Sequence, residues 1–169
     1  MPKTQSALLE AMEERQVTIE GATYKLESPF IVMATQNPIE MEGTYPLPEA
    51  QMDRFTIKLS LGYLKSLEKE CEILRRRINW KNDNPTDNIE NVVTQQDMLN
   101  LQEEAEKVYV DENIIKYISL IVRATREHPK IRIGSSPRGG LSLLKLSRAM
   151  AVINGRDFVI PDDVKTLAI

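Results

Sequence analysis

Three short polar segments carry the residues best suited to phosphate chemistry. Asn37 follows the apolar stretch 30–34 in Ala-Thr-Gln-Asn-Pro, and Arg54 lies seventeen residues later in Asp-Arg-Phe. Arg138 lies in Ser-Ser-Pro-Arg-Gly. A neutral amide can hold a water molecule in line with a phosphate, and arginine offers a permanent charge on a planar fork of donors. These residue types are able to contact a phosphate and to hold a water molecule beside it.

Each of these residues also has a purely structural explanation. Asparagine before proline commonly starts a turn, so the spacing alone favours a turn at Asn37. Arg54 can form a solvated ion pair of little energy with Asp53 or another nearby acid. Arg138 can likewise be a surface arginine paired to an acid. However, a cation in the first turn of a helix opposes the helix dipole, and this local cost favours a functional use of Arg138.

The composition excludes several classes of protein. The chain has 169 residues, of which 41% are hydrophobic and 28% charged, and its net charge of −3 gives no reason to expect a nucleic-acid partner. One cysteine and one histidine are too few ligands for a zinc site, and a single cysteine rules out an intramolecular disulfide. No apolar run is long enough to cross a bilayer, and the N-terminal residues do not have the pattern of a signal peptide. We expect a cytoplasmic protein with no metal site and no membrane insertion.

The first part of the chain, residues 1–63, shows an α/β pattern. In the expected hairpin, a turn at Glu20-Gly21 places Val17 opposite Tyr24 on one apolar face. The unbroken apolar run before Asn37 predicts a strand that is buried on both faces of a sheet. In chain order, the expected elements are a helix over 2–14, the hairpin over 16–26, a strand over 30–34, a short helix opened by Pro48 and carrying Arg54, and a strand over 57–61.

From residue 64 the apolar spacing changes to the period of a helix, which predicts an all-α region over 64–169. Ser136 is expected to cap a helix that ends at Asn154-Gly155. The sequence of residues 108–112 is similar to that of an apolar strand ending in Asp-Glu. We interpret Asp111 instead as the N-cap of the helix that follows.

The segments ATQNP, PEAQMDRF and GSSPRG, in this order and spacing, resemble the MoxR family of AAA+ ATPases, and the resemblance covers residues 2–169. It implies an α/β fold followed by an all-α one: the second half of an AAA+ core over 1–63 and a helical lid over 64–169. Asn37 would be sensor 1, and Arg54 the arginine finger that acts in trans on the next subunit. Arg138 would be sensor 2, on the ATP phosphates.

The chain contains no GxxxxGK[ST] segment, which is the Walker A loop of such enzymes, and no Walker B strand. The resemblance therefore indicates a C-terminal fragment, with the lid also expected to be cut short at its end. Binding of ATP and Mg²⁺ would depend on the missing upstream segment. We expect the chain alone to be inactive.

For the parent protein, the resemblance implies ATP hydrolysis in a ring-shaped homo-oligomer, expected to be a hexamer. Hydrolysis would be coupled to remodelling or chaperone-like maturation of partner proteins, which include proteins with von Willebrand factor A domains. The alternative is a non-enzymatic interaction module derived from an AAA+ ATPase, and the missing catalytic half favours it. A nucleic-acid motor has little support beyond the basic run Arg75–Arg77.

Overall fold

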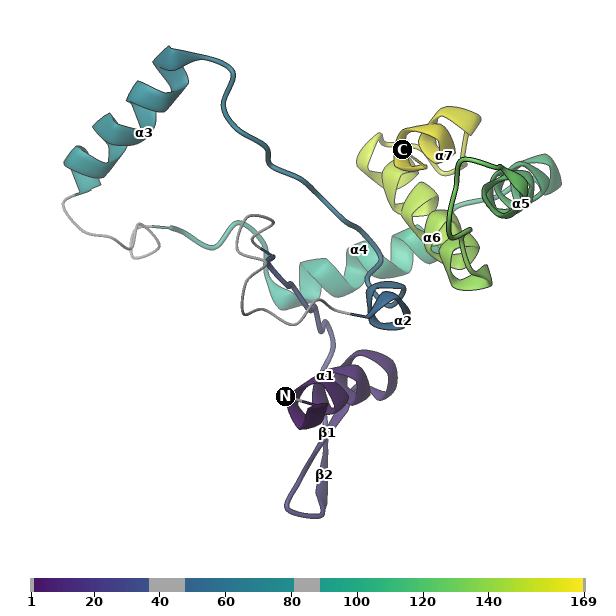
Figure 1. Cartoon of the computed structure of the whole chain (residues 1–169), viewed down its shortest axis with the longest axis horizontal. Coiled ribbons are helices and arrows are strands. Elements are labelled where there is room, and N and C mark those ends of the chain that lie inside the picture. Colours follow the sequence, from purple (N-terminus) through teal and green to yellow (C-terminus); the bar gives the residue numbers. More distant parts are fainter. Residues whose placement is uncertain (1, 37–47, 81–88, 169) are drawn as a thin grey trace. The chain divides into compact units, whose positions relative to one another are not determined.

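The computed structural model describes residues 2–36, 48–80 and 89–168 (Figure 1). Asn37 therefore lies outside the described residues. The chain forms two compact units, one made of residues 1–56 together with 95–169 and the other of residues 57–94. The predicted domain boundary between residues 63 and 64 stays a prediction.

The first unit begins with a helix and a hairpin: α1 (Pro2–Glu14), β1 (Gln16–Ile19) and β2 (Ala22–Lys25). Val17 pairs with Tyr24, which confirms the predicted register. Glu20 and Gly21 both have positive φ, 51° and 82°, as a two-residue turn that matches the twist of its strands requires. The Thr18 hydroxyl donates to Glu10 Oε1 at 2.6 Å, so the hairpin is fastened to α1.

The two strands predicted outside this hairpin are not formed in the structure. Residues 30–36 and 57–61 have no strand pairing, and Ile31 and Met33 are 63% and 90% exposed. A buried strand needs hydrogen-bonded neighbours for its backbone, and among the described residues β1 and β2 pair only with each other. The apolar pattern of a two-sided strand is thus present without the sheet that would bury it.

The short helix near Arg54 is α2 (Glu49–Met52), and it begins one residue later than predicted. The carbonyl of Pro48 accepts hydrogen bonds from the backbone N–H groups of Gln51 and Met52, at 2.8 and 3.1 Å. Pro48 therefore precedes the helix instead of occupying its first position. Arg54 lies just after the helix, where its N–H donates to the Gln51 carbonyl at 3.3 Å.

The unit formed by residues 57–94 contains α3 (Leu67–Trp80). The helical period after residue 64 predicted this helix, which begins three residues later than expected. Its first turn holds Glu68 and Glu70, and its last turn Arg77, so its charges complement the helix dipole at both ends. None of its residues is buried.

The remaining helices of the first unit pack against one another, and an apolar core lies among the last three of them. They are α4 (Gln95–Lys107), α5 (Glu112–Glu127), α6 (Pro137–Ile153) and α7 (Pro161–Leu167), and α6 contacts the other three. A parallel β-bridge joins Tyr109, in the link between α4 and α5, to Phe158, in the link between α6 and α7. Removal of apolar side chains from water drives this packing. The buried core consists of Val108, Ile114, Ile118, Leu143, Ala151, Val159 and Val164.

The predicted ends of these helices are confirmed. Asp111 Oδ1 accepts the backbone N–H of Asn113 at 2.8 Å, so Asp111 caps α5 and does not end a strand. Ser136 Oγ accepts the backbone N–H of Arg138 at 3.2 Å and caps α6. At the other end of α6, Gly155 adopts a φ of 67° and lets the chain turn out of the helix.

A partly buried ion pair fastens α7 to the segment after α6. Arg156 donates from Nη1 to Asp163 Oδ2 at 2.8 Å and from Nη2 to Oδ1 at 2.5 Å, while the Ile160 N–H donates to Oδ2 at 3.0 Å. The Asp163 side chain is only 4% exposed. The hydrogen bonds from Arg156, and then that from Ile160, lower the pKa of Asp163, although burial opposes them. The carboxylate is therefore held charged inside the fold.

We expect Asp163→Asn to destabilise the protein by on the order of 2 kcal/mol at pH 7, because it leaves Arg156 without its charged partner. Since the pKa of Asp163 is lowered by folding, its contribution is present above the ordinary value of 3.8 and is lost as the pH falls through the folded pKa. Thermal melts should show the gap between wild type and variant shrinking below pH 4.

The neighbouring Asp162→Asn is the matched control, because Asp162 is exposed in the same turn of α7. Asp162→Asn should change the free energy of unfolding by less than about 1 kcal/mol. A gap between wild type and Asp163→Asn that stays constant down to pH 2 would contradict the assignment.

Candidate functional site

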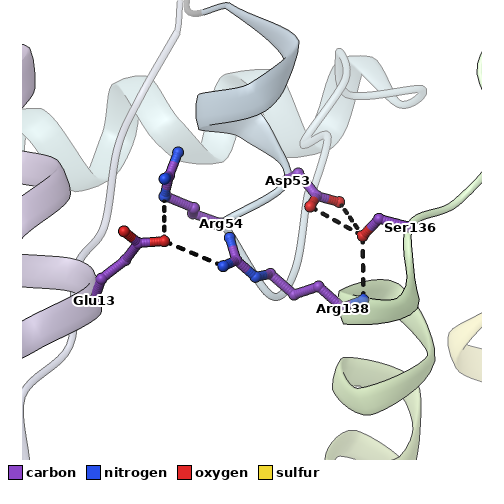
Figure 2. Close-up of polar contacts among 5 residues, drawn as sticks. All are labelled: Glu13, Asp53, Arg54, Ser136 and Arg138. Atoms are coloured by element: carbon purple, nitrogen blue, oxygen red, sulfur yellow. Dashed lines mark hydrogen bonds and ion pairs between the residues drawn. The ribbon is translucent and has the colours of Figure 1, made fainter.

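Two of the three predicted site residues meet on one carboxylate (Figure 2). Glu13 Oε1 accepts a hydrogen bond from Arg54 Nε at 2.7 Å and another from Arg138 Nη2 at 3.1 Å. Both distances are those of charge-assisted hydrogen bonds. Three segments that are far apart in the sequence thus place two cations on a single oxygen atom.

A second contact holds the two arginine-bearing segments together. Ser136 Oγ donates toward both carboxylate oxygens of Asp53, at 2.9 Å each, and accepts the N–H of Arg138 (Figure 2). Asp53 directly precedes Arg54, and Ser136 lies two residues before Arg138. The cap of α6 is therefore also the link that sets one arginine beside the other.

The loop before α6 is fixed against the end of α5. Ser135 N–H donates to Thr125 Oγ1 at 2.9 Å, and Arg126 Nε donates to the Ser135 carbonyl at 2.7 Å. At Gly134, a Cβ atom would lie 2.6 Å from the Arg126 Cα, so the loop can pack this closely only without a side chain. This packing explains why the Gly-Ser-Ser-Pro-Arg segment begins with glycine.

The site is charged and open to solvent. The hydrogen bond from Arg54, and then that from Arg138, lowers the pKa of Glu13 below its ordinary value of 4.5, so Glu13 is an anion at neutral pH. In return, Glu13 raises the pKa of Arg54. The side chains of Arg54, Glu13 and Arg138 are 23%, 39% and 47% exposed, so a dissolved anion can reach the arginines.

Glu13 is the member of this site that the sequence analysis missed. It lies at the carboxyl end of α1, where an acid opposes the helix dipole, just as Arg138 opposes it in the first turn of α6. The same signal that singled out Arg138 was therefore available at Glu13. The structure does not describe Asn37 and leaves its role a prediction.

Beside this site lies a cavity of about 230 Å³ with a mixed lining, which includes Asp53, Thr125, Ser135 and Leu143. Within the described ranges, no three His, Cys, Asp or Glu side chains gather as a metal site would require. Nor do the described helices include one that is long and apolar enough to cross a membrane.

Comparisons with known proteins identify the class of protein. Residues 1–57 match the family model described as "ATPase family associated with various cellular activities (AAA)", and residues 123–169 match that of the AAA lid domain. The chain is 50% identical, over 167 residues, to the uncharacterised protein YeaC of Bacillus subtilis, covering 99% of this chain and 51% of that protein. It is 43% identical to the chaperone MoxR1 of Mycobacterium tuberculosis over 171 residues, covering 96% of this chain and 44% of MoxR1.

A crystal structure from Cytophaga hutchinsonii, described as a candidate ATPase, superposes with a TM-score of 0.85 at 45% identity, covering 99% of this chain and 52% of that one. The chain spans about half the length of the curated relatives it matches. The fold is that of an AAA+ ATPase, with an α/β start followed by helices that include a lid, which confirms the predicted fold class. Within that class, the chain belongs to the MoxR-like family.

We expect Gly134→Ala to destabilise the protein by about 1–3 kcal/mol, because its Cβ would meet backbone atoms of Arg126 that cannot move aside cheaply. Gly140→Ala is the matched control. Its Cβ would lie 3.5 Å from Val122, an ordinary contact, and alanine favours the interior of α6 by up to about 1 kcal/mol. Urea denaturation of both variants should give shifts of opposite sign, and equal shifts would contradict this account of the loop.

Proposed function

We propose that this chain is part of a MoxR-type AAA+ ATPase that couples ATP binding and hydrolysis to remodelling or chaperone-like maturation of partner proteins. The observation that carries the proposal is the meeting of Arg54 and Arg138 on one carboxylate oxygen. The resemblance of the sequence to the MoxR family implies that both residues are phosphate ligands. The name of the relative MoxR1, a chaperone, supports the coupling to partner proteins.

The geometry fits a phosphate because carboxylate and phosphate oxygens accept hydrogen bonds from guanidinium groups in the same way. Since the two arginines reach one oxygen atom of Glu13, we assign both to the same phosphoryl group. Arg54 as an arginine finger serves the nucleotide of the next subunit, so Arg138 serves that nucleotide as well. Their charges would stabilise the negative charge on the transferred phosphoryl group.

The remaining parts of the proposal come from the family. Asn37 would orient the attacking water as sensor 1. Residues outside this chain would bind ATP and Mg²⁺, the ion that neutralises phosphate charge in such enzymes. A finger in trans requires a neighbouring subunit, and we propose that the subunits form a homo-hexameric ring. We also propose a cytoplasmic protein whose partners carry von Willebrand factor A domains.

An active chimera can test the site residues. It joins the half of the Bacillus subtilis relative that precedes the matched region to this chain. We expect the chimera to hydrolyse ATP and Arg54→Ala to lower kcat by roughly 10³- to 10⁵-fold, the range found for arginine fingers. Arg123→Ala removes an exposed arginine of α5 and should leave kcat within about twofold. Equal losses in the two variants would refute the assignment of Arg54.

Mixing subunits tests whether Arg138 acts in trans. An Arg138→Ala chimera is mixed with a chimera whose Walker A lysine is replaced, each being inactive alone. If Arg138 serves the neighbour's nucleotide, the mixture regains ATPase activity, because the second subunit supplies its arginine to the intact phosphate loop of the first. No recovery with Arg138→Ala, alongside recovery with Arg54→Ala, would place Arg138 on its own subunit's nucleotide.

The 169-residue chain by itself should show negligible ATPase activity, because it holds neither a GxxxxGK[ST] loop nor the lysine that such a loop supplies. The measurement is phosphate release by the purified chain against a mock preparation. Turnover above the mock level that Arg138→Ala abolishes would overturn this expectation.

A further inference from the structure

We propose that Glu13 is an internal competitor for the phosphate: its carboxylate occupies the place of a phosphoryl oxygen between Arg54 and Arg138 and must leave when a phosphate binds. This inference rests on the proposed function, because it takes the two arginines as phosphate ligands. It assigns to Glu13 a role in setting the strength and selectivity of that site.

The contacts of Glu13 are those expected of a stand-in for the ligand. One of its oxygens, Oε1, takes both hydrogen bonds, as one oxygen of a phosphoryl group would take them. The carboxylate comes from α1, whereas Arg54 follows α2 and Arg138 lies in the first turn of α6 (Figure 2). The two arginines therefore share an anion that neither of their own segments provides.

A phosphate cannot join this arrangement without a change. With Glu13 in place, the incoming anion would lie within a few ångströms of a carboxylate, and like charges at that distance repel each other. The Glu13 side chain is 39% exposed, so it can turn into solvent and be hydrated at small cost. The free energy of binding is then the difference between the arginines' interaction with the phosphate and their interaction with Glu13. This difference lowers the affinity of the site, and it favours ligands with several negative charges over ligands with one.

The test uses inorganic tripolyphosphate as the probe and the 169-residue chain, at low ionic strength where surface charges are least screened. Calorimetric titration of Glu13→Gln should give a Kd roughly five- to tenfold lower than that of the wild type, as expected from removing one nearby charge. Glu14→Gln is the matched control, since it removes the same charge from the next residue of α1, and its Kd should stay within about twofold of wild type.

Three further variants separate the possible failures. Arg54→Ala and Arg138→Ala should each weaken binding, and Glu13→Gln should give no gain in an Arg138→Ala background. If neither arginine variant changes the affinity, the proposed phosphate site itself is refuted. If both arginine variants weaken binding while Glu13→Gln binds no better than wild type, the site stands and the competitor role fails.

A measurement on the wild-type protein tests the proposal without relying on the correct folding of any variant. The ¹³C resonance of the Glu13 carboxyl group should move as tripolyphosphate is added, toward the position of a hydrated glutamate. A resonance that stays in place while the arginine side-chain N–H signals shift would overturn the proposal, because the phosphate would then bind beside Glu13.

Discussion

This site depends on an anion between two guanidinium groups, because the anion offsets the repulsion between their positive charges. Arg54 and Arg138 carry permanent positive charges, and their mutual repulsion falls when both donate to Glu13 Oε1. The contact between Ser136 and Asp53 adds a second, adjacent link between the same two segments. Together these contacts connect α1, the end of α2 and the start of α6. The position of α6 is therefore coupled to the anion that the two arginines contact.

In the proposed function, that coupling would give the helical region a mechanical role. Arg138 lies in the first turn of α6, and α6 contacts α4, α5 and α7 around a common core. A displacement of Arg138 toward a phosphate would therefore carry a packed group of helices with it, because packed cores move as units and do not deform smoothly. The partly buried pair of Arg156 with Asp163 stiffens the far end of that group, where α7 follows α6.

The sequence predicted the locally determined parts of the fold well. The hairpin register follows from a turn of two positive-φ residues, and the caps at Asp111 and Ser136 follow from side chains that bond to neighbouring backbone groups. The strand expected at 30–34 failed for the opposite reason. Its apolar run indicates that the segment suits a buried position in a sheet. However, a strand forms only by hydrogen bonding to neighbouring strands, and among the described residues no strand pairs with it.

The same distinction applies to the site: some of its features follow from local sequence, and others depend on contacts between distant segments. Arg54 and Arg138 could be singled out one at a time, from their motifs and from the cost of a cation at a helix start. That they share a carboxylate depends on contacts spanning 41 and 125 positions, which no local pattern encodes. Helix ends offer a partial remedy, because charges that oppose a dipole need a compensating partner, and two such misplaced charges of opposite sign, Glu13 and Arg138, are candidates for each other. Pairing the unfavourable helix-end charges in a sequence is thus a physical route to contacts that spacing alone does not reveal.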